Sequence, residues 1–374
     1  MKKTIILSVL TLAFAFTSAV KAEMSLSGYA EFFAGSASQN KFKAAEGAHG
    51  LDKSGMKNGL YSRVTANYDT TLDSGIDVAG TMSLTNRDCQ GDKTGNCNVV
   101  NFNFMTFSGG FGSVSIGERH DVGAVMLSRL TASNPVNEPD GGVIGEFYTG
   151  DGANDFGSAN ETHYANNSMK AFFMSNVYSG FSFSVGYTPN TAEDGSGIAG
   201  TNPGVGDFGE WASHSDVLSV FGKYAMDIDG IGLELVYGQI TGNSGDSGGS
   251  SYNDLDEAAY SALITYGNFA ADYRKNEAND SGRIKNGQDG NDEGTSICGT
   301  YTMGNIGVGV CNVETSFTDT SNLSNSSTTR TYSAEYQLGG GVALGVVYFD
   351  VDQTANGSTR TDADGLVSRI SVGF

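Results

Sequence analysis

The segment Asp256–Asn276, DEAAYSALITYGNFAADYRKN, contains two alternating stretches separated by a Gly-Asn pair. Every second residue from Tyr260 to Tyr266 is apolar or aromatic, and this period of two indicates a β-strand rather than a helix. Gly267-Asn268 has the composition of a two-residue hairpin turn, in which both positions tolerate positive φ. The segment therefore predicts an antiparallel hairpin.

The same pattern recurs along the chain and predicts sixteen strands. Their expected ranges are 24–35, 58–72, 74–86, 98–108, 111–118, 161–175, 180–188, 213–227, 230–241, 256–266, 269–276, 295–303, 306–315, 329–338, 341–350 and 364–374. The connections after even-numbered strands are tiny, such as Gly109-Gly110, Gly304-Asn305 and Gly339-Gly340, whereas those after odd-numbered strands are long and polar. This alternation is typical of an outer-membrane barrel with short periplasmic turns and long outer loops.

The two faces of each predicted strand differ in polarity. One face carries Val, Leu, Ile, Phe, Tyr and Met, and the other carries Ser, Thr, Asn, charged residues and Gly. A barrel of sixteen strands is too wide for side chains to fill, so we expect the polar face to line a water-filled lumen and the apolar face to meet lipid. The predicted fold class is all-β, a transmembrane 16-stranded antiparallel up-and-down β-barrel.

The N-terminus has the features of a secretory signal peptide. Lys2 and Lys3 precede an apolar run from Ile5 to Val20, and cleavage is expected after Ala22. A transmembrane helix is the alternative, but the run is short and no stop-transfer charges follow it. We expect residues 1–22 to be removed and 23–374 to form a single barrel domain. The formal net charge of −21 argues against nucleic acid as a partner.

The last predicted strand ends in a terminal phenylalanine. Leu366, Ile370, Val372 and Phe374 share one face of it, and the first strand after the signal peptide contains Leu26-Ser-Gly-Tyr-Ala30. With the sixteen strands, these features resemble the Gram-negative general-diffusion porins of the outer membrane. The resemblance implies a homotrimeric channel for small hydrophilic solutes, with Phe374 read by the barrel assembly machinery. It also implies that lipopolysaccharide surrounds the barrel and that the second outer loop contacts the neighbouring protomer of the trimer.

The longest connection, residues 119–160, follows the fifth strand and is expected to be functional because of its length. By resemblance, it folds into the barrel and constricts the pore. Its acidic residues then face basic residues on the opposite wall. The candidate acids are Asp121, Glu138, Asp140, Glu146 and Asp151, and the candidate wall residues are Arg63, Arg369 and Arg87. Arg63 and Arg369 could be neighbours because their strands flank the first strand. The acidic surplus predicts a weak preference for cations.

Four cysteines suggest two disulfides, since an exported chain meets an oxidising compartment. Cys89 and Cys97 bracket the second outer loop, and Cys298 and Cys311 are paired by the Gly304-Asn305 turn at a non-hydrogen-bonded site, where side chains approach most closely. A metal site is the alternative, but no Cys or His partners stand at zinc-like spacing.

Other functional classes have weaker support. The histidines His49, His120, His163 and His214 lie in no recognisable nucleophile motif, so we expect no enzyme. The acidic loop stretches 151–155 and 286–292 could bind calcium through oxygen ligands, but lack a complete calcium-loop spacing, and no other cofactor is indicated. Two alternatives to a general porin stay open: a substrate-specific channel, which would need an aromatic or basic ladder in the lumen, and a non-channel surface adhesin.

Overall fold

The structure is a computed structural model. It describes residues 23–39, 55–86, 100–127, 144, 147, 168–191, 214–244, 251–279, 291–318, 324–355 and 359–374.

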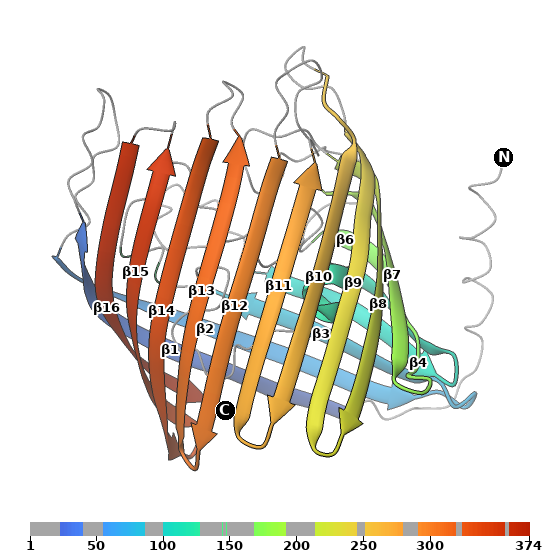
Figure 1. Cartoon of the computed structure of the whole chain (residues 1–374). Coiled ribbons are helices and arrows are strands. Elements are labelled where there is room, and N and C mark those ends of the chain that lie inside the picture. Colours follow the sequence, from blue (N-terminus) through green and yellow to red (C-terminus); the bar gives the residue numbers. More distant parts are fainter. Residues whose placement is uncertain are drawn as a thin grey trace.

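Sixteen strands form one closed sheet in which each strand pairs with its sequence neighbours, and β1 pairs with β16 (Figure 1). Every pairing is antiparallel, which confirms the predicted barrel. The strands are β1 (Glu23–Gln39), β2 (Gly55–Thr71), β3 (Asp77–Thr85), β4 (Val100–Gly109), β5 (Gly112–Glu118), β6 (Met169–Met174), β7 (Phe181–Asn190), β8 (His214–Ile228), β9 (Ile231–Ser244), β10 (Leu255–Tyr266), β11 (Phe269–Asn279), β12 (Asn291–Met303), β13 (Ile306–Thr318), β14 (Ser324–Gly339), β15 (Val342–Ala355) and β16 (Thr359–Gly373).

The tight turns gather at one end of the barrel, the lower edge in Figure 1, where the C-terminus also lies. Glycines with positive φ occupy several of them, including Gly267, Gly304 and Gly340. Several strands are longer than the sequence pattern indicates at the end opposite the tight turns. Polar residues there continue the backbone hydrogen bonding between strands. Some strands are shorter than expected, and the largest difference is at β6, which begins at Met169, whereas the alternation suggested residue 161.

The seam between the first and last strands closes at the terminal residue. The backbone N–H of Phe374 donates to the carbonyl of Gly28, and the N–H of Gly28 donates to the carbonyl of Phe374, both at 3.0 Å. Gly28 allows this approach, because a Cβ at this position would lie 2.8 Å from the ring of Phe374. The C-terminal aromatic residue therefore completes the ring of strands.

The outward face is apolar through the middle of the barrel. On β15, Leu344, Val346 and Tyr348 point outward and are about 40% exposed, whereas Val347 and Phe349, of the opposite parity, are fully buried. An exposed apolar band of this kind is stable when it faces lipid. Among the described residues, no helix is long and apolar enough to cross a membrane.

The inward face is less uniformly polar than the sequence pattern suggested. Val347, Phe349 and Val351 of β15 point inward, as do Phe221 of β8 and Ile240 of β9. These side chains belong to two apolar clusters inside the barrel. The prediction that a polar face lines the whole lumen is therefore wrong for these strands, because segments inside the barrel pack against them.

Candidate functional site

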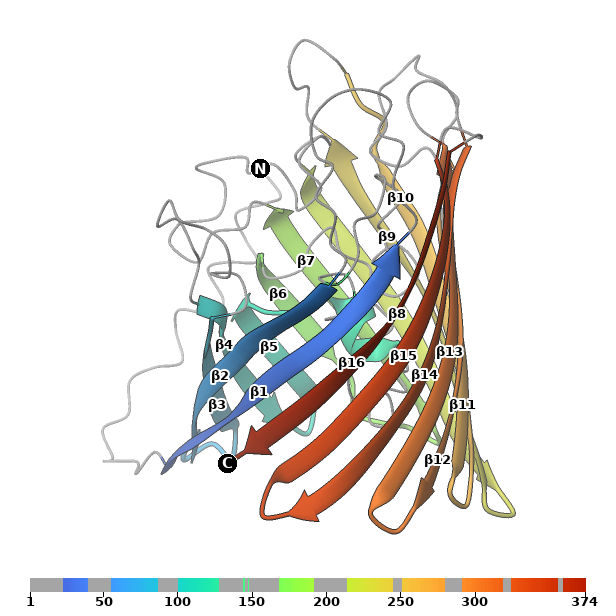
Figure 2. The same ribbon diagram turned by 90° about the vertical axis from the view of Figure 1, so that its left-hand side faces the viewer.

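The connection after β5 enters the barrel and contacts its wall in two places. The short helix α1 (Val122–Met126) packs against β7 and β8, and its side chains join a cluster with Phe221 and Ile240 (Figure 2). Further along the loop, Ile144 and Phe147 are buried in the second cluster, whose members include Phe33 of β1 and Phe349 of β15. Apolar contacts thus hold the loop to both sides of the lumen.

Asp121 was expected to face the pore, but the structure buries its side chain to 1% exposure. Its carboxylate caps α1 by accepting a hydrogen bond from the backbone N–H of Gly123, and it accepts another from the hydroxyl of Ser219 on β8. A carboxylate at this position satisfies the first N–H groups of the helix. Asp121 is therefore a positioning residue for the loop and does not line open water.

Exposure along the inner wall shows where water reaches the lumen. Each strand from β7 to β16 contributes an inward residue no more than 4% exposed: Ser184, Ser219, Ile240, Ser261, Arg274, Ser296, Val313, Thr329, Val347 and Val367. Tyr61, Ser83 and Thr85 of β2 and β3 are buried as well, but seven inward residues of β2, β3 and β4 are half-buried. We call these residues the open strip: Arg63, Thr65, Asn67, Thr81, Phe102, Phe104 and Thr106. Half-buried inward side chains of the described barrel therefore gather on β2–β4, beside buried residues of the same strands.

Two arginines lie at this strip, each against aromatic rings. The guanidinium carbon of Arg63 is 5.6 Å from the ring centroids of both Tyr29 and Phe102. Arg119, directly after β5, lies 4.7 Å from the ring of Phe104 and 4.3 Å from that of Phe172. Burial lowers the pKa of the Arg119 guanidinium from its ordinary value, but a guanidinium stays protonated near neutral pH.

Three other inward cations are paired with carboxylates. Arg369 binds Glu31 of β1 at 2.8 Å and also contacts Glu335 of β14. Lys223 binds Glu234 at 2.9 Å, and Arg274 contacts Asp272 at 3.3 Å.

The two predicted wall arginines face the same lumen but are not adjacent. Arg63 pairs across β1 with Tyr29, and Arg369 pairs with Phe33, four residues further along that strand. At about 3.3 Å per residue, this offset alone is about 13 Å. Arg63 therefore belongs to the open strip, and Arg369 belongs to a separate, carboxylate-paired group.

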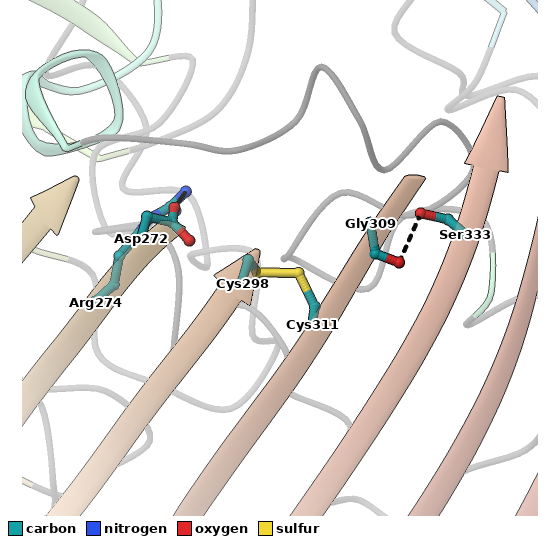
Figure 3. The surroundings of a disulfide bond; sticks show 6 residues. All are labelled: Asp272, Arg274, Cys298, Gly309, Cys311 and Ser333. Atoms are coloured by element: carbon teal, nitrogen blue, oxygen red, sulfur yellow. Dashed lines mark hydrogen bonds and ion pairs between the residues drawn. A yellow bond between two sulfur atoms is a disulfide. The ribbon is translucent and has the colours of Figure 1, made fainter. Parts of the chain in front are cut away.

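Cys298 and Cys311 are directly opposite each other on β12 and β13 and form a disulfide on the inner wall (Figure 3). The Cα atoms are 4.1 Å apart, the close approach of a non-hydrogen-bonded pair. The buried Asp272 and Arg274 lie on the neighbouring strand β11 (Figure 3). The disulfide thus joins two strands of the covered wall.

Several predicted residues lie outside the described part of the chain. These are Arg87, Glu138, Asp140, Glu146, Asp151, Cys89 and Cys97, together with the expected signal peptide 1–22 and most of both candidate calcium stretches. Within the described residues, no group of three or more His, Cys, Asp or Glu side chains could hold a metal ion.

Sequence reasoning missed two cations near the strip. Lys170 of β6 points inward and donates to the backbone carbonyls of Arg119 and, at 2.7 Å, Ser168. Lys170 and Phe172 are two positions apart on β6, so their side chains point to the same face of the strand, and the sequence could have indicated this. Arg119 carried no such signal, because its side chain direction depends on how the chain leaves β5.

Comparisons with known proteins agree with this architecture. A family model described as Gram-negative porin matches residues 8–358. None of the curated proteins compared matches the sequence.

Solved structures of outer-membrane barrels share the fold at low sequence identity. The outer membrane channel DcaP of Acinetobacter baumannii is 10% identical with a TM-score of 0.64, over 96% of this chain and 99% of that one. The anion-selective porin of Comamonas acidovorans is 16% identical with a TM-score of 0.59, over 95% and 100%. A trimer form of the outer membrane protein OmpT of Vibrio cholerae is 11% identical with a TM-score of 0.59, over 94% and 99%. A closed barrel with a loop held in its lumen, together with a family match over nearly the whole chain, shows that the protein belongs to the Gram-negative porin family and is a multi-pass β-barrel channel of the outer membrane.

Proposed function

We propose that the channel is water-filled and allows passive diffusion of ions and small hydrophilic solutes. The observation that carries this proposal is the open strip, because its half-buried side chains, which include Arg63, Asn67 and three threonines, follow one side of the lumen. A lumen lined this way stabilises hydrated solutes and disfavours apolar ones.

The proposal includes a weak preference for cations. The chain has 42 acidic against 21 basic residues, and the loop after β5 contains Glu138, Asp140 and Glu146. Carboxylates near a narrow part of a pore raise the local concentration of cations. The Comamonas relative is described as anion-selective, so the sign of the selectivity must be measured for this chain.

We also propose that the protein assembles as a homotrimer. Support comes from the trimer form of the Vibrio relative and from the resemblance to trimeric porins. The same reasoning proposes lipopolysaccharide as the surrounding lipid and the barrel assembly machinery as the partner that reads Phe374.

Single-channel recording tests the function. The refolded protein is placed in a planar bilayer under a KCl gradient. Ohmic steps in groups of three support a trimeric diffusion channel, and the sign of the reversal potential decides between cations and anions. A folded, inserted barrel without conductance would overturn the proposal and favour a surface adhesin.

A further inference from the structure

The outward wall of the barrel contains a groove that crosses strands β11–β15, which lie side by side in Figure 1. Its volume is about 720 Å³, and the atoms that line it are almost entirely apolar. Among the described residues that line it, none is charged. The groove opens on the apolar band that faces lipid, so an occupant would enter it from the membrane.

Small outward residues form the floor of the groove. Ala271 of β11 is paired with Gly299 of β12, and Ala334 of β14 is paired with Val346 of β15. A Cβ added at Gly299 would lie 3.8 Å from its nearest contact, so a side chain would fit there. The backbone of Gly299 does not adopt a positive φ. A strand glycine that neither conformation nor close packing requires often marks the approach of a ligand.

Other strand glycines are covered by rings of this chain. A Cβ at Gly80 would lie 1.9 Å from the ring of Tyr68, and a Cβ at Gly238 would lie 2.2 Å from the ring of Phe221. Among the described residues, no ring comes within 4 Å of the corresponding position at Gly299. The hollow above Gly299 is therefore open to a group from outside the chain.

Two aromatic pairs border this floor. Phe269 and Tyr301 have ring centroids 4.4 Å apart, and Tyr332 and Tyr348 have ring centroids 6.2 Å apart. The first pair lies beside the tight turns of β10–β13, at the end of the barrel that faces the periplasm. Beyond the second pair, the outward face becomes charged at Arg330. The groove therefore begins at the periplasmic edge of the apolar band and ends before its outer edge.

The length of the groove matches one leaflet of the membrane. From β11 to β14 it crosses three strand spacings, about 14 Å. The hydrocarbon core is about 30 Å thick, so the acyl chains of one leaflet fill about 15 Å of it.

We propose that the groove on β11–β15 binds one acyl chain of a phospholipid from the periplasmic leaflet and retains this lipid longer than the surrounding lipid. The groove is continuous with the lipid-facing band, carries no charge on its described lining, and begins at the periplasmic edge. Acyl chains and the groove are equally apolar, so retention depends on close van der Waals contact with the floor. The inference goes beyond the proposed diffusion function and is independent of it, because it concerns the outer wall.

Native mass spectrometry of the barrel refolded with palmitoyl-oleoyl phosphatidylethanolamine tests the proposal. We expect each wild-type barrel to keep one phospholipid under activation that removes the others. Gly299→Leu fills the hollow and should lower the retained fraction about tenfold, which corresponds to the loss of about ten carbon–carbon contacts. Ala271→Leu fills the floor from the neighbouring strand and should act in the same direction.

Gly222→Leu is the matched control, because Gly222 lies on the outward face of β8, outside the groove, where a Cβ would lie 3.6 Å from Phe181. This variant should retain the phospholipid. Heat-dependent migration in gels verifies that each variant is a folded barrel. Phosphatidylglycerol should be retained as well as phosphatidylethanolamine, since the groove holds the chain and not the headgroup.

Equal retention in the wild type and in both groove variants would overturn the site, as would a strong preference for phosphatidylglycerol. Fewer barrels per complex in Gly299→Leu, with the phospholipid still retained, would instead assign the groove to contact with a second copy of the chain. Single-channel conductance in KCl, measured on the same preparations, tests the diffusion function separately.

Discussion

The hydroxyl of Ser219 donates to the carboxylate of Asp121, 3.0 Å from Oδ1, and this contact joins the start of the loop after β5 to the wall strand β8. The contact is buried and lies beside Gly186 of β7, where a Cβ would approach Val122 to 2.5 Å. The helix α1 therefore sits against the wall with no room for a side chain between them. The path of the pore depends on this attachment.

Asp121→Ala should loosen the loop. The substitution removes the helix cap, which contributes about 1 kcal/mol, and also the acceptor for Ser219. We expect larger or noisier single-channel currents, since the loop would leave its place on β7 and β8 more often. Asp227→Ala is the control, because Asp227 caps an exposed tight turn through the N–H of Gly230. Currents equal to those of the wild type would show that the apolar contacts hold the loop without Asp121.

Phe349→Ala should destabilise the barrel by about 3–5 kcal/mol, the range for a buried phenylalanine. The side chain is fully buried and belongs to the cluster that contains Ile144 and Phe147. Denaturant unfolding in lipid vesicles measures the change. The neighbouring Val346→Ala on the outward face should cost less, because acyl chains can fill the space that it leaves. Equal losses for both variants would contradict the packing of the loop on β15.

Reduction of the Cys298–Cys311 disulfide should leave a folded barrel of lower stability. The two residues are separated by 13 positions, and closing a loop of this size contributes about 3 kcal/mol in the chain-entropy account. The ladder of β12 and β13 continues on both sides of the bond, so the register should survive. Denaturant midpoints with and without reductant measure the loss. Non-reducing peptide mapping also tests the second predicted pair, Cys89 and Cys97, and crossed pairs or free thiols would contradict the assignment.

Neutralising Glu138, Asp140 and Glu146 together, by E138Q, D140N and E146Q, should shift the reversal potential toward anions. The reason is that carboxylates near the narrow part of a pore attract cations. The measurement is the reversal potential of single channels under a KCl gradient. Neutralising outward acids, by D350N and D352N on β15, serves as the control. A potential that does not move would remove the loop acids from the account of selectivity.

Deleting Phe374 should impair assembly in cells more than stability after refolding. The deletion removes two backbone hydrogen bonds of the β1–β16 seam, but the strands remain paired from Tyr29 and Gly373 onward. Western blots of folded barrel in outer-membrane fractions, compared with refolding yield in detergent, separate the two effects. Replacement by Tyr keeps an aromatic end and is expected to assemble normally.

Much of the fold follows from local pattern. The alternation in segments such as Tyr260–Tyr266 specifies a strand, because successive side chains point to opposite faces. A two-residue turn such as Gly304-Asn305 then determines the register of its hairpin, which is why Cys298 and Cys311 could be placed opposite each other. Sixteen strand segments whose connections alternate between short and long predict a closed membrane barrel, and the strand order agrees with this prediction.

The site was less accessible to this reasoning. Strand parity correctly directs Arg63 and Arg369 inward, but it cannot reveal that Glu31 and Glu335 compensate one of them while aromatic rings surround the other. Those contacts depend on how the side chains of different strands meet inside the barrel, which the parity of one strand does not specify.

The sequence by itself determined the strands, their faces and their order, because these depend on neighbours along the chain and on a period of two. Only the tertiary structure decided which part of the lumen is open, since that depends on where the loop after β5 packs. Asp121 is buried against Ser219, Ile144 is buried in the cluster that contains Phe349, and the guanidinium of Arg119 lies over the ring of Phe104. Each of these contacts forms across the barrel interior, where packing and desolvation of distant residues determine the position of a side chain.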